Sequence, residues 1–341
     1  MRPVAMPSAP RTLRTLAVIA VLALMGVALA FGRGTSPVAT VVQARTLNAL
    51  AVPDLARPPW FAMRVVDDSV SFHVAGSPIR PPAIPAAGGI LVDIDSGAIL
   101  WQHDAHAQLP PASTTKILTA LVALANFSAD QDVTITPASL HQAWDETRMG
   151  LGVGQRYTVE ELLTGMLLVS GNDAATAIAQ DTVGLERFVA AMNAQAAALG
   201  LHDSHFTSPV GLQDAQHHTS AYDLAAISVA TIRHFPLFGK IVAMHDATLA
   251  ATADHPGFQL SSINQLLAMY PYAVGIKPGW TGDAGNCLVG MAVRGGHRLI
   301  SVLLNAPYDF RQSRTLLDWG FGQEGLPTTL PTPAPSATAH G

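Results

Sequence analysis

A serine and a lysine that could act as a nucleophile and its base lie three residues apart, at Ser113 and Lys116. Apolar residues repeat with a helical period over residues 113–127, and side chains three apart on a helix share one face. A serine hydroxyl attacks a carbonyl only when a neighbouring group takes its proton. A lysine amine can do so once burial or a second cation lowers its pKa from about 10.4. The pair indicates acyl transfer, but a Ser-x-x-Lys pattern also arises by chance, as an N-cap followed by a solvated lysine.

Two further motifs could complete such a site. Ser170-Gly171-Asn172 lies between two predicted helices, where glycine permits a tight connection from which a hydroxyl and an amide project. Lys277-Pro278-Gly279 lies at the end of a strand predicted over residues 273–276. Taken singly, the first is equally well explained as a helix-linking turn and the second as a surface lysine before a Pro-Gly turn. Their order after the Ser-x-x-Lys pair favours one composite site.

The elements that must position these residues have strands at both ends and helices between them. Strands are predicted over residues 89–94, 98–102, 273–276, 286–293 and 298–305, with Gly295-Gly296 as a hairpin turn. Helices are predicted over residues 113–127, 158–169, 172–183, 185–199, 221–234 and 309–320. This order predicts an α+β fold, in which one antiparallel sheet is flanked by terminal helices and a helical lobe lies beside it.

Composition divides the 341 residues into four segments. Residues 1–31 are predicted to be a signal peptide or signal-anchor. The proline-rich residues 32–87 are predicted to be a poorly structured spacer. Residues 88–322 form the compact domain that carries the composite site. Residues 323–341 are rich in proline and threonine and are expected to be a disordered tail.

The N-terminal segment predicts export. Three arginines precede an uncharged apolar run from Leu16 to Phe31. The run is longer than a usual signal-peptide core and shorter than a full membrane span. Ala28 and Ala30 form a small-x-small pair compatible with cleavage, so a cleaved signal and a retained anchor to the cytoplasmic membrane both stay open. In either case the arginines keep this end inside, and the rest of the chain is extracytoplasmic, secreted or anchored at the outer face of that membrane.

Composition also excludes several classes of function. With 49% hydrophobic residues the chain has ample material for a core, and a net charge of -5 without a basic run argues against binding to nucleic acid. The single cysteine, Cys287, excludes an intrachain disulfide framework and is interpreted as a buried small residue. The closest histidine groupings, His202/His205 and His217/His218, lack the His-Glu-x-x-His pattern. They are expected to be solvated or hydrogen-bonded, so no metal is predicted.

At this point the sequence resembles the serine-type D-alanyl-D-alanine carboxypeptidases, the low-molecular-mass penicillin-binding proteins. The resemblance covers nearly all of residues 88–322. It is carried by segments 111–120 (PASTTKILTA), 168–175 (LVSGNDAA), 206–212 (FTSPVGL) and 221–225 (AYDLA), together with Gly275-Ile276-Lys277 and Ala284-Gly285. Each motif alone is weak, and together they are specific. The resemblance implies a fold like that of β-lactamases and DD-peptidases.

The family's mechanism, carried over by position, is acyl transfer without a metal or organic cofactor. Ser113 would attack the penultimate D-Ala carbonyl of a peptidoglycan stem peptide ending in D-Ala-D-Ala, and Lys116 would accept the proton. Ser170, Asn172 and Lys277 would relay that proton to the leaving D-Ala. Water would then release the acyl-enzyme, and β-lactams would acylate the same serine.

The resemblance also implies a substrate-binding segment, formed by Lys277, Gly279, Trp280 and Thr281. The oxyanion would be bound by the backbone N–H groups of Ser113 and Trp280. The peptide would lie antiparallel along the strand that ends at Lys277 and extend the sheet edge.

Pro278 departs from the family pattern, which usually has threonine at this position. Proline lacks a hydroxyl and an N–H group, although an edge strand tolerates it. The fold is therefore not in question, but recognition of the terminal carboxylate is. Thr281 matches a second family threonine and could take over that role with Lys277.

Two other functions are compatible with part of this pattern. A class A β-lactamase needs a glutamate after the second motif to activate the deacylating water, and none occurs between Glu186 and Glu324. The other alternative is a non-catalytic wall-binding module, in which Pro278 would indicate that catalytic activity has been lost. Survival of both serines, both lysines and Asn172 argues against such a loss. The sequence does not separate carboxypeptidase from endopeptidase activity, and it leaves the oligomeric state open.

Overall fold

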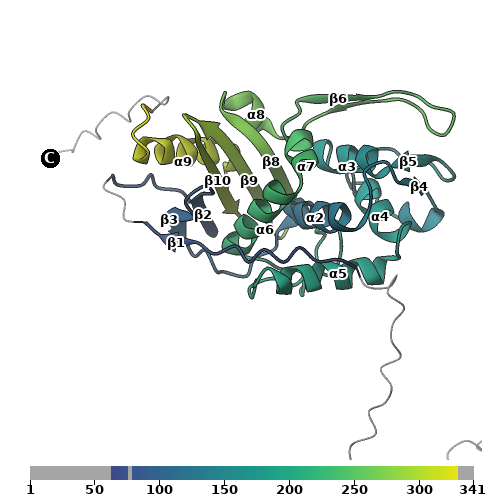
Figure 1. The fold of residues 1–341 in the computed structure, drawn as a ribbon, viewed down its shortest axis with the longest axis horizontal. Helices are drawn as coiled ribbons and strands as arrows, with labels where there is room; N and C mark the ends of the chain where they lie inside the picture. Colours follow the sequence, from purple (N-terminus) through teal and green to yellow (C-terminus); the bar gives the residue numbers. More distant parts are fainter. Residues whose placement is uncertain (1–62, 76–78, 329–341) are drawn as a thin grey trace, which may run out of the picture. The chain divides into compact units, whose positions relative to one another are not determined.

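The computed structural model describes residues 63–75 and 79–328. Its centre is a six-stranded sheet with the order β1-β3-β2-β10-β9-β8 (Figure 1). The strands are β1 (His73–Val74), β2 (Gly88–Asp93), β3 (Ala98–His103), β8 (Ala273–Thr281), β9 (Gly285–Arg294) and β10 (His297–Leu304). Apart from the short parallel pairing of β1 with β3, neighbouring strands in this described sheet are antiparallel. The predicted α+β fold, with one sheet built from both ends of the domain, is confirmed.

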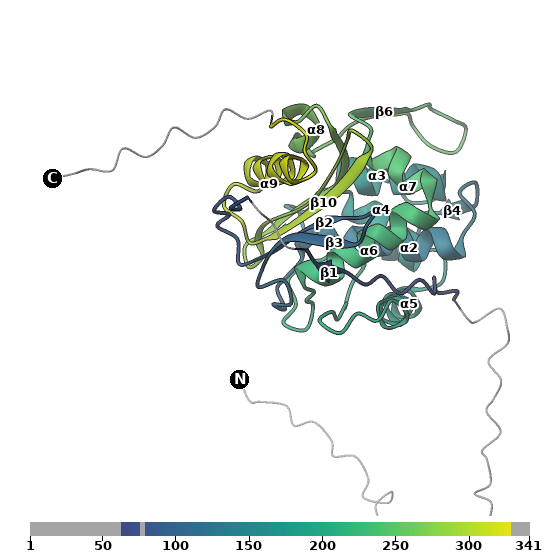
Figure 2. The ribbon, with the colours of Figure 1, turned by 60° about the vertical axis from the view of Figure 1, so that its left-hand side comes forward.

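Helices pack on both faces of the sheet. α9 (Asp309–Gln323) and α8 (Gln265–Met269) lie on one face, and α6 (Ala221–His234) lies on the other with α2 (Lys116–Asn126) packed against it (Figures 1 and 2). The helical lobe beside the sheet contains α3 (Val159–Leu168), α4 (Asn172–Gln180), α5 (Leu185–Ala198) and α7 (Pro236–Val242). One buried apolar cluster joins the sheet to α2, α6 and the lobe, and a second joins the sheet to α9.

The lobe also carries short elements. Two ribbons pair β4 (Asp132–Thr134) with β5 (Arg156–Thr158), and β6 (Asp246–Leu249) with β7 (Phe258–Ser261). Two 3₁₀ turns are η2 (Ala112–Thr115) and η3 (Pro137–Ser139). The predicted capping box opens α3, because Thr158 Oγ1 accepts a hydrogen bond from Glu161 N and Glu161 Oε2 accepts one from Thr158 N.

Two boundaries near the composite site differ from the sequence prediction. Ser113 does not open an α-helix: it lies in η2, and α2 begins at Lys116. The predicted strand over residues 273–276 continues to Thr281, so Lys277 lies in the middle of β8 rather than at its end. The alternative explanation of Pro278-Gly279 as a turn is wrong, because both residues lie in β8. This is an edge strand of the described sheet, the position at which the sequence analysis expects proline to be tolerated.

Parts of the predicted spacer and tail pack on the domain. Gln195 Nε2 and Oε1 hydrogen-bond to the backbone of Val66 at 2.9 and 2.7 Å, and β1 pairs with β3. At the other end, α9 extends to Gln323, and Leu326 N donates to Phe321 O at 3.0 Å. These described stretches therefore pack on the domain, where the composition predicts poorly structured segments. Residues 1–31, 32–62, 76–78 and 329–341 lie outside the described residues.

Over residues 63–75 and 79–328, no single helix has the length and apolar character of a membrane span. α6 and α7 meet those criteria only as a pair, and the chain bends by 112° between them. The residues of α6 are mostly buried in the domain core.

Candidate active site

The serine and lysine of the first motif are in direct contact. Lys116 Nζ lies 2.8 Å from Ser113 Oγ. In a 3₁₀ turn, residues i and i+3 lie almost above one another, so η2 brings the two side chains together at the start of α2. Gly211 packs against the carbonyl of Ala112, so closely that a β-carbon there would lie 1.9 Å from the Ala112 oxygen. The glycine at 211 therefore lets the loop from α5 to α6 close over the turn.

The Lys116 amine is fully buried and surrounded by acceptors. Besides Ser113 Oγ, it contacts Asn172 Oδ1 at 2.6 Å and Val210 O at 3.1 Å. Burial lowers the pKa of Lys116 well below its usual value, and the positive charge of Lys277 lowers it further. The carboxylates of Glu146 and Asp173 act against both effects. The amine therefore gives up its own proton more readily than a solvated lysine does, and proton transfer from the serine requires the unprotonated form.

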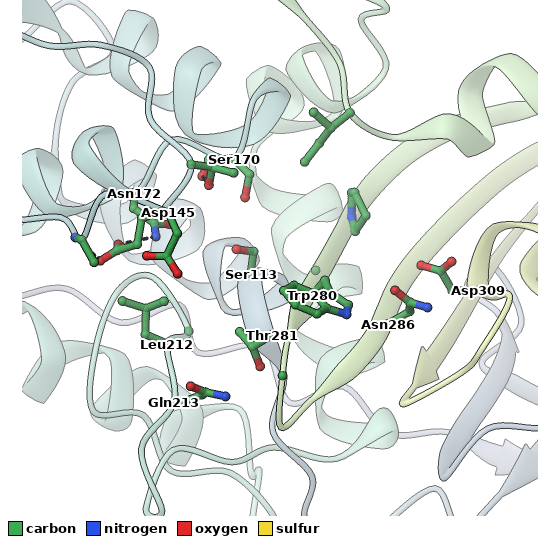
Figure 3. A pocket seen from close by; sticks show the side chains of 18 of the residues that line it. Ser113, Asp145, Ser170, Asn172, Leu212, Gln213, Trp280, Thr281, Asn286 and Asp309 are labelled. Atoms are coloured by element: carbon green, nitrogen blue, oxygen red, sulfur yellow. Dashed lines mark hydrogen bonds between the residues drawn. The ribbon is translucent and has the colours of Figure 1, made fainter.

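The second motif forms the junction between α3 and α4, as predicted. Ser170 has a φ of 60°, an uncommon value for a residue with a side chain, and its side chain lines the cavity beside Ser113 (Figure 3). Asn172 is the first residue of α4 and extends its amide to Lys116. The buried Asp173 carboxylate accepts hydrogen bonds from three successive backbone N–H groups, those of Met149, Gly150 and Leu151, at 2.7–3.1 Å.

The third motif lies on β8, whose free edge borders the cavity. The Lys277 side chain is fully buried, and its Nζ donates to Pro278 O at 3.0 Å. Burial lowers the pKa of Lys277 to about 7. Pro278 and Gly279 line the cavity, and Trp280 at its rim is 68% exposed. Thr281 also lines the cavity, and its Oγ1 accepts a hydrogen bond from Ala284 N at 3.1 Å.

These segments enclose a cavity of about 590 Å³. Six of the eight site residues predicted from sequence line it: Ser113, Ser170, Asn172, Gly279, Trp280 and Thr281. The two lysines lie buried beneath its floor. Apolar side chains from three other segments complete the wall, namely Leu212, Ile263 and Phe310. Figure 3 shows Ser113 at the centre, with Ser170 and Asn172 on one side and Trp280 and Thr281 on the other. The structure therefore brings all three motifs together.

Glu146 is a cavity residue that the sequence analysis missed. Its loop precedes the second motif, and its Oε2 accepts a hydrogen bond from Asn172 Nδ2 at 2.6 Å. The sequence signal was an acidic pair, Asp145-Glu146, in a polar stretch between predicted elements. Nothing in that stretch shows which element its side chains face, because the contact depends on a loop that folds back onto α4.

His217 contacts the η2 turn, which carries Ser113. The buried imidazole lies with Nε2 2.9 Å from Thr115 Oγ1, and its Nδ1 accepts from Thr207 N at 3.1 Å. The Nε2 proton therefore faces Thr115, whose hydroxyl donates to Ala112 O at 2.9 Å. Burial lowers the pKa of His217 to about 4, which keeps the ring neutral at physiological pH. The expectation of a hydrogen-bonded histidine is confirmed for this residue.

One histidine–carboxylate cluster in the described part of the chain has a spacing that could suit a metal. Ligand atoms of Asp93, His297 and Glu324 lie within 4.8 Å of one another. Asp93 Oδ1 already accepts hydrogen bonds from the backbone N–H groups of Asp95 and Ser96, at 2.8 and 3.3 Å. These bonds give that carboxylate a role in the β2–β3 turn, and none of the three residues lines the cavity around Ser113.

Comparisons with known proteins agree with this geometry. A sequence profile described as D-alanyl-D-alanine carboxypeptidase matches residues 76–308. D-alanyl-D-alanine carboxypeptidase DacB2 of Mycobacterium tuberculosis is 38% identical over 255 residues, covering 72% of this chain and 86% of that protein. D-alanyl-D-alanine carboxypeptidase DacF of Bacillus subtilis is 32% identical over 245 residues, covering 70% of this chain and 62% of that protein.

Solved structures are similar over the same region. The crystal structure of a D-alanyl-D-alanine carboxypeptidase from M. tuberculosis H37Rv has a TM-score of 0.67 at 37% identity, covering 73% of this chain and 95% of that one. The Streptomyces K15 DD-transpeptidase has a TM-score of 0.68 at 31% identity, covering 72% of this chain and all of that one.

Proposed function

Because the chain belongs to the D-alanyl-D-alanine carboxypeptidase family, we propose that it removes the terminal D-alanine from peptidoglycan stem peptides through a serine acyl-enzyme. The observation that carries the proposal is the fully buried Lys116 amine, 2.8 Å from the Ser113 hydroxyl at the floor of an open cavity. A solvated lysine would keep its proton, whereas burial and Lys277 lower the pKa of this one.

Acylation follows from the contacts around Ser113. Lys116 Nζ takes the hydroxyl proton while Oγ bonds to the carbonyl carbon of the penultimate D-Ala. When the tetrahedral intermediate collapses, the peptide C–N bond breaks and the terminal D-Ala leaves with its bonding electrons and a proton. Ser170, beside Ser113 in the cavity, is the proposed relay for that proton. Water then hydrolyses the ester and restores the free serine.

The developing oxyanion is proposed to bind to two backbone N–H groups, those of Ser113 and Trp280. Gly279 supports this arrangement, because its lack of a side chain lets β8 lie directly against the η2 turn. Among the described strands β8 pairs with β9 alone, so its other edge is proposed to pair with an extended peptide. The substrate would lie antiparallel along β8 as far as Thr281, beyond the strand end predicted from sequence.

The terminal carboxylate is proposed to bind to Thr281 and Lys277. Thr281 lines the cavity, and its hydroxyl proton is free to donate while its oxygen accepts from Ala284 N. Pro278 supplies no hydroxyl, so Thr281 carries the neutral hydrogen bond to the carboxylate. β-Lactams, which present a carbonyl and a carboxylate at similar spacing, would acylate Ser113 through the same contacts.

The proposed site of action is the outer face of the cytoplasmic membrane, where stem peptides are exposed. Three arginines before the apolar run that ends at Phe31 favour export, with residues 1–31 as a cleaved signal or a retained anchor. Mass measurement of the exported protein would separate the two. A mature chain that begins after Ala30 indicates cleavage, and a chain that starts at Met1 indicates an anchor.

The test of the activity is intact-mass measurement after incubation with benzylpenicillin, with Ser113→Ala as the control. The proposal predicts one penicilloyl adduct on the wild type, none on the variant, and release of D-alanine from a pentapeptide. A chain that stays unlabelled is a non-catalytic binding module. Rapid loss of the adduct with penicillin turnover would identify a β-lactamase, and cleavage of crosslinked dimers would identify an endopeptidase.

A further inference from the structure

Glu146 places a carboxylate in the wall of the Ser113 cavity, and no step of the proposed acyl transfer uses it. Its Oε2 accepts a hydrogen bond from Asn172 Nδ2 at 2.6 Å, and its Oε1 accepts one from Ala143 N at 2.8 Å. The side chain is half-buried. Both carboxylate oxygens are therefore held, one by its own loop and one by the second motif.

The contact determines which way the Asn172 amide points. An amide group has a donor end and an acceptor end, whereas an ionised carboxylate only accepts. Only Asn172 Nδ2 can therefore face Glu146, and this leaves Oδ1 to accept from Lys116 Nζ at 2.6 Å. In the flipped orientation two acceptors would meet at Glu146, and Asn172 Nδ2 would turn a donor toward Lys116 Nζ, whose lone pair must stay free for the Ser113 proton; both mismatches are unfavourable.

We propose that Glu146 is a positioning residue for the Ser113 reaction: it holds the Asn172 amide with its oxygen toward Lys116, and the amide in turn holds the lysine amine against the serine hydroxyl. The chain of contacts runs from Glu146 Oε2 through Asn172 to Lys116 and ends at Ser113 Oγ, with distances of 2.6, 2.6 and 2.8 Å. The inference rests on the proposed function, since it concerns the base of that reaction.

The loop that carries Glu146 is fixed to the same motif. Thr147 Oγ1 donates to Ser170 O at 2.7 Å, and Asn172 N donates to Thr147 O at 2.9 Å. On its other side, the Arg148 guanidinium donates to the carbonyls of Gln142 and Ala143 and closes the loop. These bonds fix the loop on the second motif, and the loop in turn fixes the position of the Glu146 carboxylate relative to the Asn172 amide.

Glu146 also has an electrostatic effect that can be separated from its hydrogen bond. Its negative charge raises the pKa of Lys116, as does that of Asp173 on α4, whereas Lys277 on β8 lowers it. Glutamine at position 146 can keep its carbonyl oxygen toward Asn172 Nδ2, but it loses the charge and turns its amide nitrogen toward Ala143 N, so the bond from that exposed residue is lost. Alanine would lose the charge and both hydrogen bonds. Comparing the two variants therefore separates the effect of the hydrogen bond that orients the Asn172 amide from the effect of the charge on the pKa of Lys116.

The experiment measures the second-order rate of Ser113 acylation by a fluorescent penicillin across pH, together with kcat and KM for D-alanine release. Glu146→Ala is expected to lower the acylation plateau and kcat by about 10- to 100-fold, the usual effect of leaving a buried polar group unpaired, with KM little changed. Glu146→Gln is expected to keep the plateau within about threefold of wild type, since the hydrogen bond from the buried Asn172 survives and the one that is lost comes from the exposed Ala143, whose N–H water can reach.

The pH profile supplies a readout that a purely structural role would not move. The acylation rate should rise with pH as Lys116 loses its proton. Removing the negative charge of Glu146 lets Lys116 lose that proton more easily, so this ascending limb of the rate should shift to lower pH in both variants. Below the wild-type limb, Glu146→Gln should acylate faster than the wild type. Glu186→Gln, in the exposed first turn of α5 and outside the Ser113 cavity, is the matched control and should change neither limb nor plateau.

Two results would overturn the proposal. One is a Glu146→Ala variant that acylates like the wild type at every pH. The other is a Glu146→Gln variant that loses as much activity as alanine while its limb stays in place, with both variants melting like the wild type. Failure of the proposed function looks different, because wild-type Ser113 would then take no label at all.

Discussion

Gly279 and Ser113 are in direct backbone contact: a β-carbon built on residue 279 would lie 2.7 Å from the Ser113 backbone nitrogen. It would also lie 3.1 Å from Ala112 Cβ and from Thr114 N. Real β-carbons essentially never approach other atoms at the first of these distances. The contact between β8 and the η2 turn therefore requires glycine, and it sets the separation of the two proposed oxyanion donors.

Gly279→Ala is expected to lower acylation of Ser113 by penicillin by about 100-fold. The new methyl group must push β8 away from η2, and a displacement of about 1 Å at the reacting groups typically costs that much. Stopped-flow measurement of the acylation rate checks this. Gly239→Ala is the matched control, because a β-carbon there meets only Ile232 Cδ1 at 3.6 Å and helix α7 accepts alanine readily. Equal rates for Gly279→Ala and wild type would remove the contact from the mechanism.

Much of this site could be predicted from the sequence because its key spacing is local. Ser113 and Lys116 are three residues apart, and that spacing places both on one side of either an α-helix or a 3₁₀ turn. The prediction therefore succeeded although the local structure was η2 rather than the start of a helix. The strands and most helices followed from their periodicity for the same reason.

The rest depends on contacts between distant segments, which local patterns do not contain. The 3₁₀ turn is fixed by Gly211 and His217, about a hundred residues further along the chain. Glu146 reaches the site only because its loop folds back onto α4. A class A β-lactamase carries its deacylating glutamate after the second motif, whereas Glu146 enters the cavity from a segment before that motif.

Thr281→Val is expected to lower kcat/KM for D-alanine release by about tenfold or more, mainly through a higher KM. A hydrogen bond to a charged group contributes about 1.5–3 kcal/mol, and valine keeps the shape of threonine without the hydroxyl. Thr281→Ser keeps the hydroxyl and should stay close to wild type. Steady-state kinetics on a pentapeptide checks both. Unchanged kinetics for the valine variant would remove Thr281 from carboxylate binding.

Asp173→Asn is expected to destabilise the domain by about 2–4 kcal/mol. The carboxylate accepts from Met149 N, Gly150 N and Leu151 N, and an asparagine would turn a donor toward at least one of these groups. Urea unfolding followed by circular dichroism measures the change. Asp254→Asn, in an exposed ion pair with Arg156, is the control, and its expected loss is much smaller because solvent screens the pair. A stability loss no larger than the control's would contradict a structural role for the buried carboxylate.

Lys277→Met is expected to stabilise the domain at low pH. The pKa of Lys277 is lowered to about 7 by burial, from 10.5, so between these two values the unfolded chain binds more protons than the folded one. Stability of the wild type therefore rises with pH across this window, and the buried charge is most unfavourable below pH 7. Replacing it with an apolar side chain of similar length should add about 1–4 kcal/mol there. The advantage should shrink as the pH approaches 10.5.

The same variant should shift the acylation profile in the direction opposite to Glu146→Gln. The Lys277 charge lowers the pKa of Lys116, so its removal raises that pKa and moves the ascending limb of the rate to higher pH. The plateau should also fall, because Lys277 is proposed to bind the carboxylate. Urea unfolding from pH 6 to 10 and penicillin acylation over the same range test both effects. A limb that moves to lower pH, or a stability gain that grows with pH, would mean that the two buried lysines do not oppose each other's charge.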